Sequence, residues 1–371
     1  MKLAIVGDTH FGIKDGSANA LIYQKHFFNE MLIPECNKRK VDGIVFLGDI
    51  FHNRRNVNMF ILSNVIQLFN KIKDETKVKL YGIEGNHDMY FRNSYDVATV
   101  REMNLGDMFY GKDGYYIVDD CLFIHWKNTA EEYKELFKEI KKKHDVKSIH
   151  YIFGHFAIQG AYMIGGRRDE NETDLVQNDF FKAFPNTAHV FSGHFHKPSK
   201  LKKITYVGTP YDLTWNDVSN TLGLTFLDTE TGMVEYIPNN LKVFNGVKLD
   251  STTIDKFNIE EYLNNIPKLD YKMVYKIIYD GKEFEPIAKN LYNEILLRNH
   301  DALLIDERVY NITDSIDDDI PANDIKSLDE LILNYFKSSK LIPDDERAEY
   351  YDLYKMFSEE VKGSSENLEF E

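Results

Sequence analysis

Five short apolar runs in this chain each end in a glycine that is followed by acidic, amide or imidazole side chains. The five segments are Gly7-Asp8-Thr9-His10, Gly48-Asp49-Ile50-Phe51-His52, Gly85-Asn86-His87-Asp88, Gly154-His155 and Gly193-His194-Phe195-His196. Short runs rich in Val, Ile, Phe and Tyr are typical of buried strands. Because the strand ends of an α/β sheet share one rim where ligands bind, we expect the five segments to converge on a single site.

The first three strands are separated by helical patterns. Apolar residues recur at three- and four-residue steps over 21–40 and 59–73, between strands expected at 3–6, 43–47 and 78–83. This alternation predicts a layered α/β domain. Further strands are expected at 115–118, 122–125, 149–153, 189–191, 204–207, 222–227 and 234–237. Because no long helix is expected between these later strands, we expect the sheet to continue as antiparallel or mixed.

We expect a boundary at Pro238-Asn-Asn, which ends a first domain that spans residues 1–240. The pattern after it predicts a small α+β domain (245–312), an acidic linker (313–326), a helical hairpin (327–362) and a flexible tail (363–371). Ser327-Leu-Asp-Glu330 is a capping box that opens the hairpin. Its two helices carry apolar stripes that are too small for a core of their own. We therefore expect the hairpin either to pack on its own chain or to bind a partner.

Composition limits the class of protein. Of the 371 residues, 43% are hydrophobic and 13% aromatic, which excludes a disordered chain. No run reaches the roughly 18 apolar residues of a membrane span, and the polar Asp8 comes too early for a signal peptide. We therefore expect a cytoplasmic protein without membrane contact. Cys36 and Cys121 lack metal-ligand spacing, so we expect two reduced, buried thiols.

The formal net charge of −15 is unevenly distributed. Residues 301–371 contain 20 acidic and 7 basic residues, so residues 1–300 are nearly neutral. An evenly acidic chain would disfavour nucleic acid, because affinity for DNA comes largely from neutralising phosphates. The nearly neutral first part of the chain leaves that substrate open.

The residue types at the expected site suit metal ions. Carboxylate, imidazole and amide ligands favour manganese, iron or zinc, and no thiolate is offered. Two ions about 3.5–4 Å apart favour in-line displacement at phosphorus. Any one of these segments could instead be a capped turn or a hydrogen-bonded core histidine. Five in order on successive strand ends favour a two-metal site.

In order, these motifs resemble the signature of the calcineurin-like metallophosphoesterases. The segments Gly48-Asp49-Ile50-Phe51-His52, Gly193-His194-Phe195-His196 and Gly208-Thr209-Pro210-Tyr211 resemble more narrowly the SbcD-type nuclease subunit of the double-strand-break repair (SbcCD) complex, particularly its bacteriophage recombination-endonuclease forms. The resemblance covers residues 1–240. It implies a metallophosphoesterase β-sandwich flanked by helices, a small capping domain that faces DNA, and a C-terminal helical hairpin.

The resemblance also implies a role for each site residue. One metal is expected on Asp8, His10 and His196, the other on Asn86, His155 and His194, with Asp49 bridging both. The two divalent ions would be Mn²⁺, with Mg²⁺, Fe²⁺ or Zn²⁺ as alternatives. His87 would contact the scissile phosphate and protonate the leaving 3′ oxygen, with Asp88 orienting it through a hydrogen bond. His52 matches a substrate-contacting position, although an exposed loop histidine would look the same.

Loop residues beside the motifs are candidates for DNA contacts. They are Arg54, Arg55, Arg92, Asn93, Tyr95, Arg167 and Arg168. The arginines could contact phosphates and Tyr95 could stack at a DNA end, although any one pair could equally be solvated surface. No segment reads as a base-reading helix, so we expect recognition of structure and ends rather than sequence.

The expected function is that of a nuclease subunit, a 3′–5′ exonuclease on duplex ends and an endonuclease. An SbcC-type ABC ATPase would regulate it and bind the hairpin through Leu331, Phe336, Leu353 and Phe357. The resemblance also implies a homodimer through the helices at 21–40 and 59–73, and host-cell cytoplasm if the source is a phage. The alternatives are a stand-alone phosphatase or cyclic-nucleotide phosphodiesterase, and a degenerate member acting only as a scaffold, which would have lost ligands.

Overall fold

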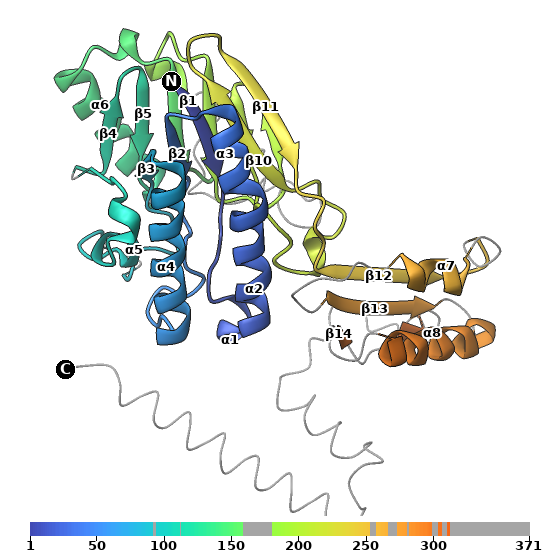
Figure 1. The fold of residues 1–371 in the computed structure, drawn as a ribbon. Coiled ribbons are helices and arrows are strands. Elements are labelled where there is room, and N and C mark those ends of the chain that lie inside the picture. Colours follow the sequence, from blue (N-terminus) through green and yellow to red (C-terminus); the bar gives the residue numbers. More distant parts are fainter. Residues whose placement is uncertain are drawn as a thin grey trace, which may run out of the picture. The chain divides into compact units, whose positions relative to one another are not determined.

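The structure is a computed structural model, and Figure 1 shows how its elements are arranged. It describes residues 1–91, 94–111, 113–158, 180–252, 257–265, 273–279, 282–298, 303–305 and 310–311. All of them belong to one compact unit, Met1–Asn311. The hairpin anchors Leu331, Phe336, Leu353 and Phe357 lie outside the described residues, as do Arg92, Asn93, Arg167 and Arg168.

The first sheet has five strands in the order β11-β10-β1-β2-β3. Their bounds are β1 Lys2–Val6, β2 Gly43–Phe46, β3 Lys79–Gly82, β10 Gly223–Asp228 and β11 Met233–Pro238. Strands β1, β2 and β3 are parallel, with Leu3 opposite Gly43 and Gly43 opposite Lys79. Strand β10 is antiparallel to β1 and to β11. The strand-helix-strand alternation predicted from the sequence is confirmed here.

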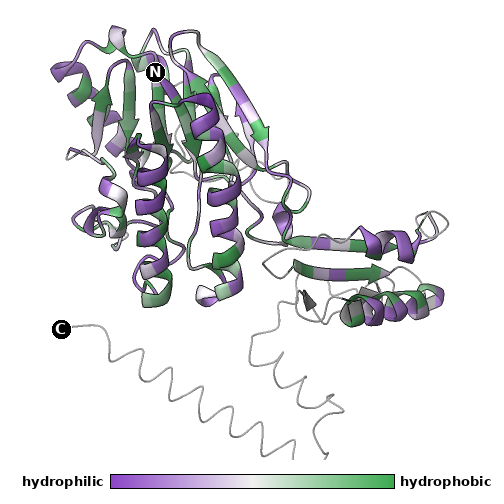
Figure 2. Cartoon of the chain, viewed as in Figure 1, coloured by the Kyte–Doolittle hydropathy of each residue, from purple (hydrophilic) through white to green (hydrophobic). Residues whose placement is uncertain are grey.

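Helices α2 (Ala18–Phe27), α3 (Ile33–Arg39) and α4 (Met59–Thr76) lie along one face of this sheet (Figure 1). Ser17 caps α2 and Asn58 caps α4 by accepting main-chain N–H bonds. A short π-helix at Phe28–Leu32 joins α2 to α3, and the single turn α1 (Ile13–Gly16) precedes α2. The side of α4 that faces the sheet is apolar and its outer side polar (Figure 2).

The expectation that the first sheet continues with antiparallel strands holds only for β10 and β11, which extend it beside β1. The other six later strands form a second sheet. Its order is β4-β5-β6-β7-β9-β8. The bounds are β4 Tyr115–Val118, β5 Cys121–Ile124, β6 Tyr151–His155, β7 His189–Gly193, β8 Ser199–Leu201 and β9 Ile204–Tyr206. Helix α6 (Ala130–Lys143), which the sequence reading missed, connects β5 to the parallel β6. The sequence pattern of this helix is hard to recognise because charged residues surround its apolar stripe. The stripe consists of Tyr133, Leu136, Phe137 and Ile140.

The two sheets pack face to face, which confirms the expected β-sandwich. Side chains alternate along the central strands, as they must in a pleated sheet. Leu3 and Val45 belong to the core between the sheets, together with Phe123 and Phe153 of the second sheet. Ala4 and its neighbours on the other face pack under the helices. This packing holds the ends of β1, β2, β6 and β7 at one rim.

The rest of the described unit is a small α+β arrangement. Strand β13 (Met273–Tyr279) is parallel to β12 (Phe244–Leu249), β14 (Leu303–Ile305) and β15 (Tyr310–Asn311). Helix α8 (Glu285–Arg298) buries Ala288, Leu291 and Ile295, and α7 is Ile259–Asn264. The short elements are α5 Thr99–Glu102 and 3₁₀ turns at Leu105–Asp107, Val146–Ser148, Phe180–Ala183, Trp215–Asp217 and Lys282–Phe284. The domain boundary near residue 240 stays a prediction.

Within the described part of the chain, no helix has both the length and the apolar character needed to cross a membrane. Cys36 and Cys121 are both buried free thiols, as expected.

Candidate metal centre

Loops from both sheets converge at one rim and bring the histidine and aspartate motifs together. Asp8 and His10 follow β1, Asp49 follows β2, and His155 and Gly193 end β6 and β7. Three groups of side chains offer ligand atoms within 4.8 Å of one another. They are Asp8, His10 and His196; Asp8, Asp49 and His155; and His10, His52 and His87.

The first group centres on His10. The Nε2 atoms of His10 and His196 are 3.1 Å apart, and His10 Nε2 lies 3.7 Å from Asp49 Oδ2. The buried Nδ1 atoms of His10 and His196 have no hydrogen-bond partner in the part of the chain that the structure describes. Two imidazole nitrogens that face each other over this distance, next to a carboxylate, suit a shared cation.

Asn86, His155 and His194 form a further set of possible ligands, which also lies near Asp49. Asn86 Oδ1 is 2.9 Å from His155 Nε2 and 3.1 Å from His194 Nδ1. Asp49 Oδ2 is 3.5 Å from the same His155 nitrogen. Asp49 Oδ2 therefore reaches both groups of histidines, as a bridging ligand would.

The electrostatics of the centre also favour cations. Asp8, Asp49 and Asp88 are at most 3% exposed. Burial raises the pKa of the Asp8 carboxyl to about 7 and that of Asp88 to about 8, and the nearby charge of Asp49 adds to both shifts. Buried carboxylates this close together are costly unless a positive charge compensates them. Divalent ions would supply that charge, so the residues present fit a metal site.

The backbone of the centre is strained at three residues that are not glycine. His10, Asp49 and His194 have φ values of 46°, 49° and 87°. Such conformations are uncommon for residues with a Cβ and cluster at functional sites. Gly85 lets the backbone pass close by, because a Cβ there would lie 2.3 Å from Asp49 Oδ1. The glycine therefore makes room for the central carboxylate.

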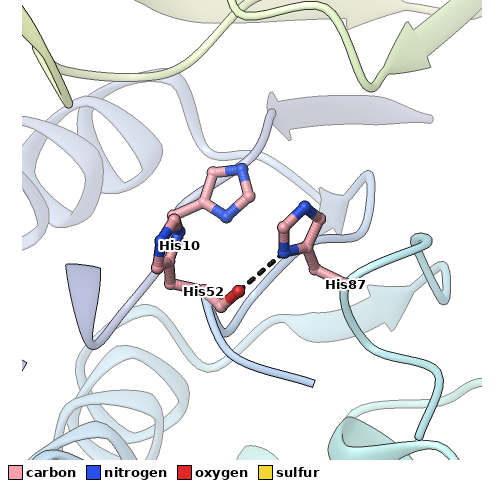
Figure 3. A group of neighbouring side chains, drawn as sticks. All are labelled: His10, His52 and His87. Atoms are coloured by element: carbon pink, nitrogen blue, oxygen red, sulfur yellow. Dashed lines mark hydrogen bonds between the residues drawn. The ribbon is translucent and has the colours of Figure 1, made fainter. Parts of the chain in front are cut away.

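His87 points into the same space as His10 and His52 (Figure 3). Its Nδ1 lies 2.6 Å from the main-chain carbonyl oxygen of His52 and donates to it (Figure 3). The ring centroids of His87 and His10 are 4.9 Å apart. Because Nδ1 is engaged in this bond, Nε2 is the ring atom of His87 that is available to a substrate.

Asp88 does not orient His87 through the expected hydrogen bond, and this prediction is corrected. Its carboxylate accepts three main-chain N–H bonds, from Gly85 at 2.8 Å, Asp49 at 2.7 Å and Ile50 at 3.0 Å. The carboxylate is buried where the loops after β2 and β3 meet, so it satisfies their amides instead of an imidazole. Asp88 therefore ties the two loops together.

The candidate DNA-contacting residues have mixed surroundings. Arg54 is half-buried, and Arg55 is exposed with its guanidinium 6.0 Å from the Tyr90 ring centre. The Tyr95 hydroxyl donates to Glu132 at 2.5 Å, and Lys127 Nζ lies 4.0 Å from the centre of the tyrosine ring. Tyr95 is thus engaged within the protein, and its stacking on DNA stays a prediction.

Trp126 is a residue of the centre that the sequence reading missed. Its ring stacks on His194 with centroids 5.1 Å apart and makes a T-shaped contact with the His155 ring, with centroids 5.8 Å apart. The tryptophan follows β5 in the same way as the other site residues follow their strands. The sequence already indicated a strand at 122–125, and residues that follow strand ends are site candidates. Trp126 could therefore have been predicted on the same basis.

The chain is similar in sequence to one known family and to a phage protein. The family model described as calcineurin-like phosphoesterase matches residues 1–198, more than half of the chain. The chain is 28% identical over 256 residues to exonuclease subunit 1 of Enterobacteria phage T4, which covers 65% of this chain and 68% of that protein. A solved chain titled "GAP50 the anchor in the inner membrane complex of Plasmodium" superposes with a TM-score of 0.35 and 12% identity, over 65% of this chain and 90% of that one. By its motifs and this family match, the chain belongs to the calcineurin-like phosphoesterases, a family of metal-dependent enzymes.

Proposed function

We propose that this protein is a nuclease that hydrolyses phosphodiester bonds of DNA with two divalent ions. The observation that carries the proposal is the position of Asp49 Oδ2, within 3.7 Å of His10 on one side and 3.5 Å of His155 on the other. The exonuclease name of the phage T4 relative supports a DNA substrate. The resemblance to SbcD-type subunits adds 3′–5′ exonuclease and endonuclease activity.

The proposed ligand sets are the two sets of side chains that lie around Asp49. Asp8, His10 and His196 would hold one ion, Asn86, His155 and His194 the other, and Asp49 both. Such nitrogen and oxygen donors suit Mn²⁺, with Mg²⁺, Fe²⁺ or Zn²⁺ as alternatives. When bound, two ions polarise the phosphoryl oxygen and activate a water for in-line attack.

His87 is the proposed general acid. Its Nδ1–H bond to the carbonyl of His52 fixes the ring, so the protonated Nε2 can donate to the leaving 3′ oxygen. His52 would contact the substrate beside it. Asp88 would act on this step indirectly, because its bonds to the amides of Gly85 and Asp49 set the loop that carries His87.

DNA would be held by contacts to its backbone. Arg54, Arg55 and Tyr95 are the described candidates, and Arg92, Asn93, Arg167 and Arg168 are candidates outside the described residues. Contacts to phosphates position DNA without reading its sequence, so the proposed specificity is for structure and ends.

The proposed partners are a second copy of this chain and an ABC ATPase with a long coiled coil. The phage T4 relative is named as a subunit, which supports a partner protein. The ATPase would bind the hairpin at 327–362 through the anchors Leu331, Phe336, Leu353 and Phe357, and the dimer would form through helices α2–α4. A host-cell cytoplasmic location belongs to the same proposal.

The test is cleavage of linear duplex DNA in Mn²⁺, compared with hydrolysis of p-nitrophenyl phosphate. The proposal predicts cleavage of DNA and weak activity on the phosphomonoester, with both lost in an Asp49→Asn control. Efficient monoester hydrolysis without DNA cleavage would show a phosphatase instead. A protein that binds DNA ends and metal but cleaves neither substrate would be a scaffold.

A further inference from the structure

The indole of Trp126 lies against side chains that are proposed to bind one of the two ions. Its ring stacks on that of His194 with centroids 5.1 Å apart and an interplanar angle of 29°. It also makes a T-shaped contact with His155, and the His155 and His194 rings contact each other with centroids 5.2 Å apart. In the described part of the chain, no ring contact joins Trp126 to His10 or His196. The ring of Trp126 therefore contacts the histidines of one proposed ligand set and not those of the other.

The two histidines differ in what orients their rings. A histidine that binds a metal usually donates its other ring N–H to a carbonyl or carboxylate, which fixes the ring. His155 has such a bond, because its Nδ1 donates to a main-chain carbonyl at 2.8 Å. Within the described residues, the ring of His194 makes its hydrogen bond to Asn86, which belongs to the same proposed ligand set. The plane of the His194 ring is set instead by aromatic neighbours, the stacked indole of Trp126 and the T-shaped ring of Phe195.

Trp126 is itself fixed at two points. Its Nε1 donates to Asn128 Oδ1 at 3.0 Å, and its main-chain amide donates to the carbonyl of Glu84 at 2.8 Å. The Glu84 amide donates in turn to Nδ1 of the buried His125 at 2.9 Å. Glu84 lies two residues before Asn86, the third proposed ligand of the same ion. These bonds join the loop after β5, in the second sheet, to the loop after β3, in the first.

We propose that Trp126 is a positioning residue for the ion at Asn86, His155 and His194. Its indole would hold the two imidazoles at the angle at which both present a nitrogen to Asn86 Oδ1, 2.9 and 3.1 Å away. Its main-chain amide would hold the loop that carries Asn86. The proposal rests on the two-metal centre argued above. It predicts that loss of the indole weakens the binding of one ion and spares the other.

The test measures Mn²⁺ binding to the full chain by isothermal titration calorimetry, without substrate. Trp126→Leu keeps an apolar side chain but removes the ring, and Trp126→Phe keeps a ring that can stack on His194. Phe109→Leu is the matched control, because Phe109 is exposed and its ring contacts Tyr116, which is no proposed ligand. Asn128→Ala leaves the indole in place but removes the acceptor of its Nε1. Melting temperatures of metal-free samples establish that each variant is folded.

We expect the wild type to bind two ions. Trp126→Leu should bind one of them about 10- to 100-fold more weakly, the loss typical when a residue that orients a metal ligand is removed. Trp126→Phe should recover most of that affinity, Asn128→Ala should weaken the same ion less, and Phe109→Leu should bind both ions as the wild type does. Anomalous diffraction from Mn²⁺ crystals of Trp126→Leu should show the reduced peak at Asn86, His155 and His194.

Unchanged binding in Trp126→Leu, or an equal loss of both ions, would overturn the positioning role and leave the two-metal centre standing. If Trp126→Leu does not fold, unchanged binding in Asn128→Ala would overturn the role in the same way. Equal losses in Trp126→Leu and Trp126→Phe would exclude ring stacking as the cause, and a reduced peak at His10 and His196 would place the effect on the wrong ion. A wild type that binds a single ion would overturn the two-metal centre, and the role of Trp126 with it.

Discussion

The side chains of the centre divide into those that face the substrate space and those that hold the backbone around it. His87 has its Nδ1 bonded to the His52 carbonyl at 2.6 Å, so Nε2 is the atom at which the proposed proton transfer would take place. Asp88 is fully buried and accepts three main-chain N–H bonds. The residues are adjacent in the chain, but their substitutions should have different consequences.

His87→Gln should slow DNA cleavage by about 10²- to 10⁴-fold, the range for a positioned acid. Metal content should stay close to that of the wild type, because no proposed ligand is removed. Single-turnover cleavage and elemental analysis of the purified variant measure the two quantities. An Asp8→Ala variant, which should lose metal, is the matched comparison. Wild-type cleavage by His87→Gln would show that this imidazole is not the acid.

Asp88→Asn should destabilise the protein, because the amide turns an N–H group towards main-chain donors. The expected loss in the free energy of unfolding is about 1–3 kcal/mol, as for buried groups left without partners. Urea unfolding followed by circular dichroism measures it. Asp113→Asn, at an exposed position, is the control and should leave stability unchanged. Equal stabilities of the two variants would contradict the role given to Asp88.

At the scale of elements, the sequence could predict those residues of the centre that directly follow a recognisable strand. Apolar runs are visible in one sequence, so the elements that place Asp8, Asp49 and Asn86 could be predicted. Helix α6 was missed because charges surround its apolar stripe. The second sheet was read as a continuation of the first, because strand pairing depends on contacts between distant residues. The positive φ of His10 follows from tertiary packing, since histidine has no strong preference for it.

Gly85→Ala tests the close approach of the loops after β2 and β3. The added Cβ would lie 2.3 Å from Asp49 Oδ1 and 2.5 Å from its main-chain nitrogen, so the central carboxylate must move. We expect weaker Mn²⁺ binding and loss of DNA cleavage, measured by isothermal titration calorimetry and a nuclease assay. Gly246→Ala is the control, because a Cβ there meets only Trp215, at 4.0 Å. Wild-type Mn²⁺ affinity in Gly85→Ala would show that the approach is not required.

For the whole molecule, the metal centre and the acidic C-terminal segment are separate parts of the chain. Every proposed metal ligand lies in the unit Met1–Asn311. Most of the net negative charge lies after residue 300, where it could steer the segment towards a basic partner and away from DNA. The metal centre can therefore be tested in a variant that lacks the segment proposed to bind a partner.

Deletion of residues 313–371 should leave Mn²⁺ binding and basal cleavage of short DNA intact, because no proposed ligand is lost. It should abolish co-purification with the coiled-coil ATPase and any stimulation by ATP. Pull-down and nuclease assays on the full chain and the deletion measure both effects. If the deletion variant bound the ATPase with full affinity, or if this variant could not fold, the C-terminal segment would not be a separate partner-binding part of the chain.

The central claim is that Asp49 bridges two divalent ions, and anomalous X-ray diffraction from crystals grown with Mn²⁺ tests it most directly. The account predicts two peaks about 3.5–4 Å apart on either side of the Asp49 carboxylate. One peak should lie against His10 and His196, and the other against Asn86, His155 and His194. A single peak, or two peaks without Asp49 between them, would contradict the account.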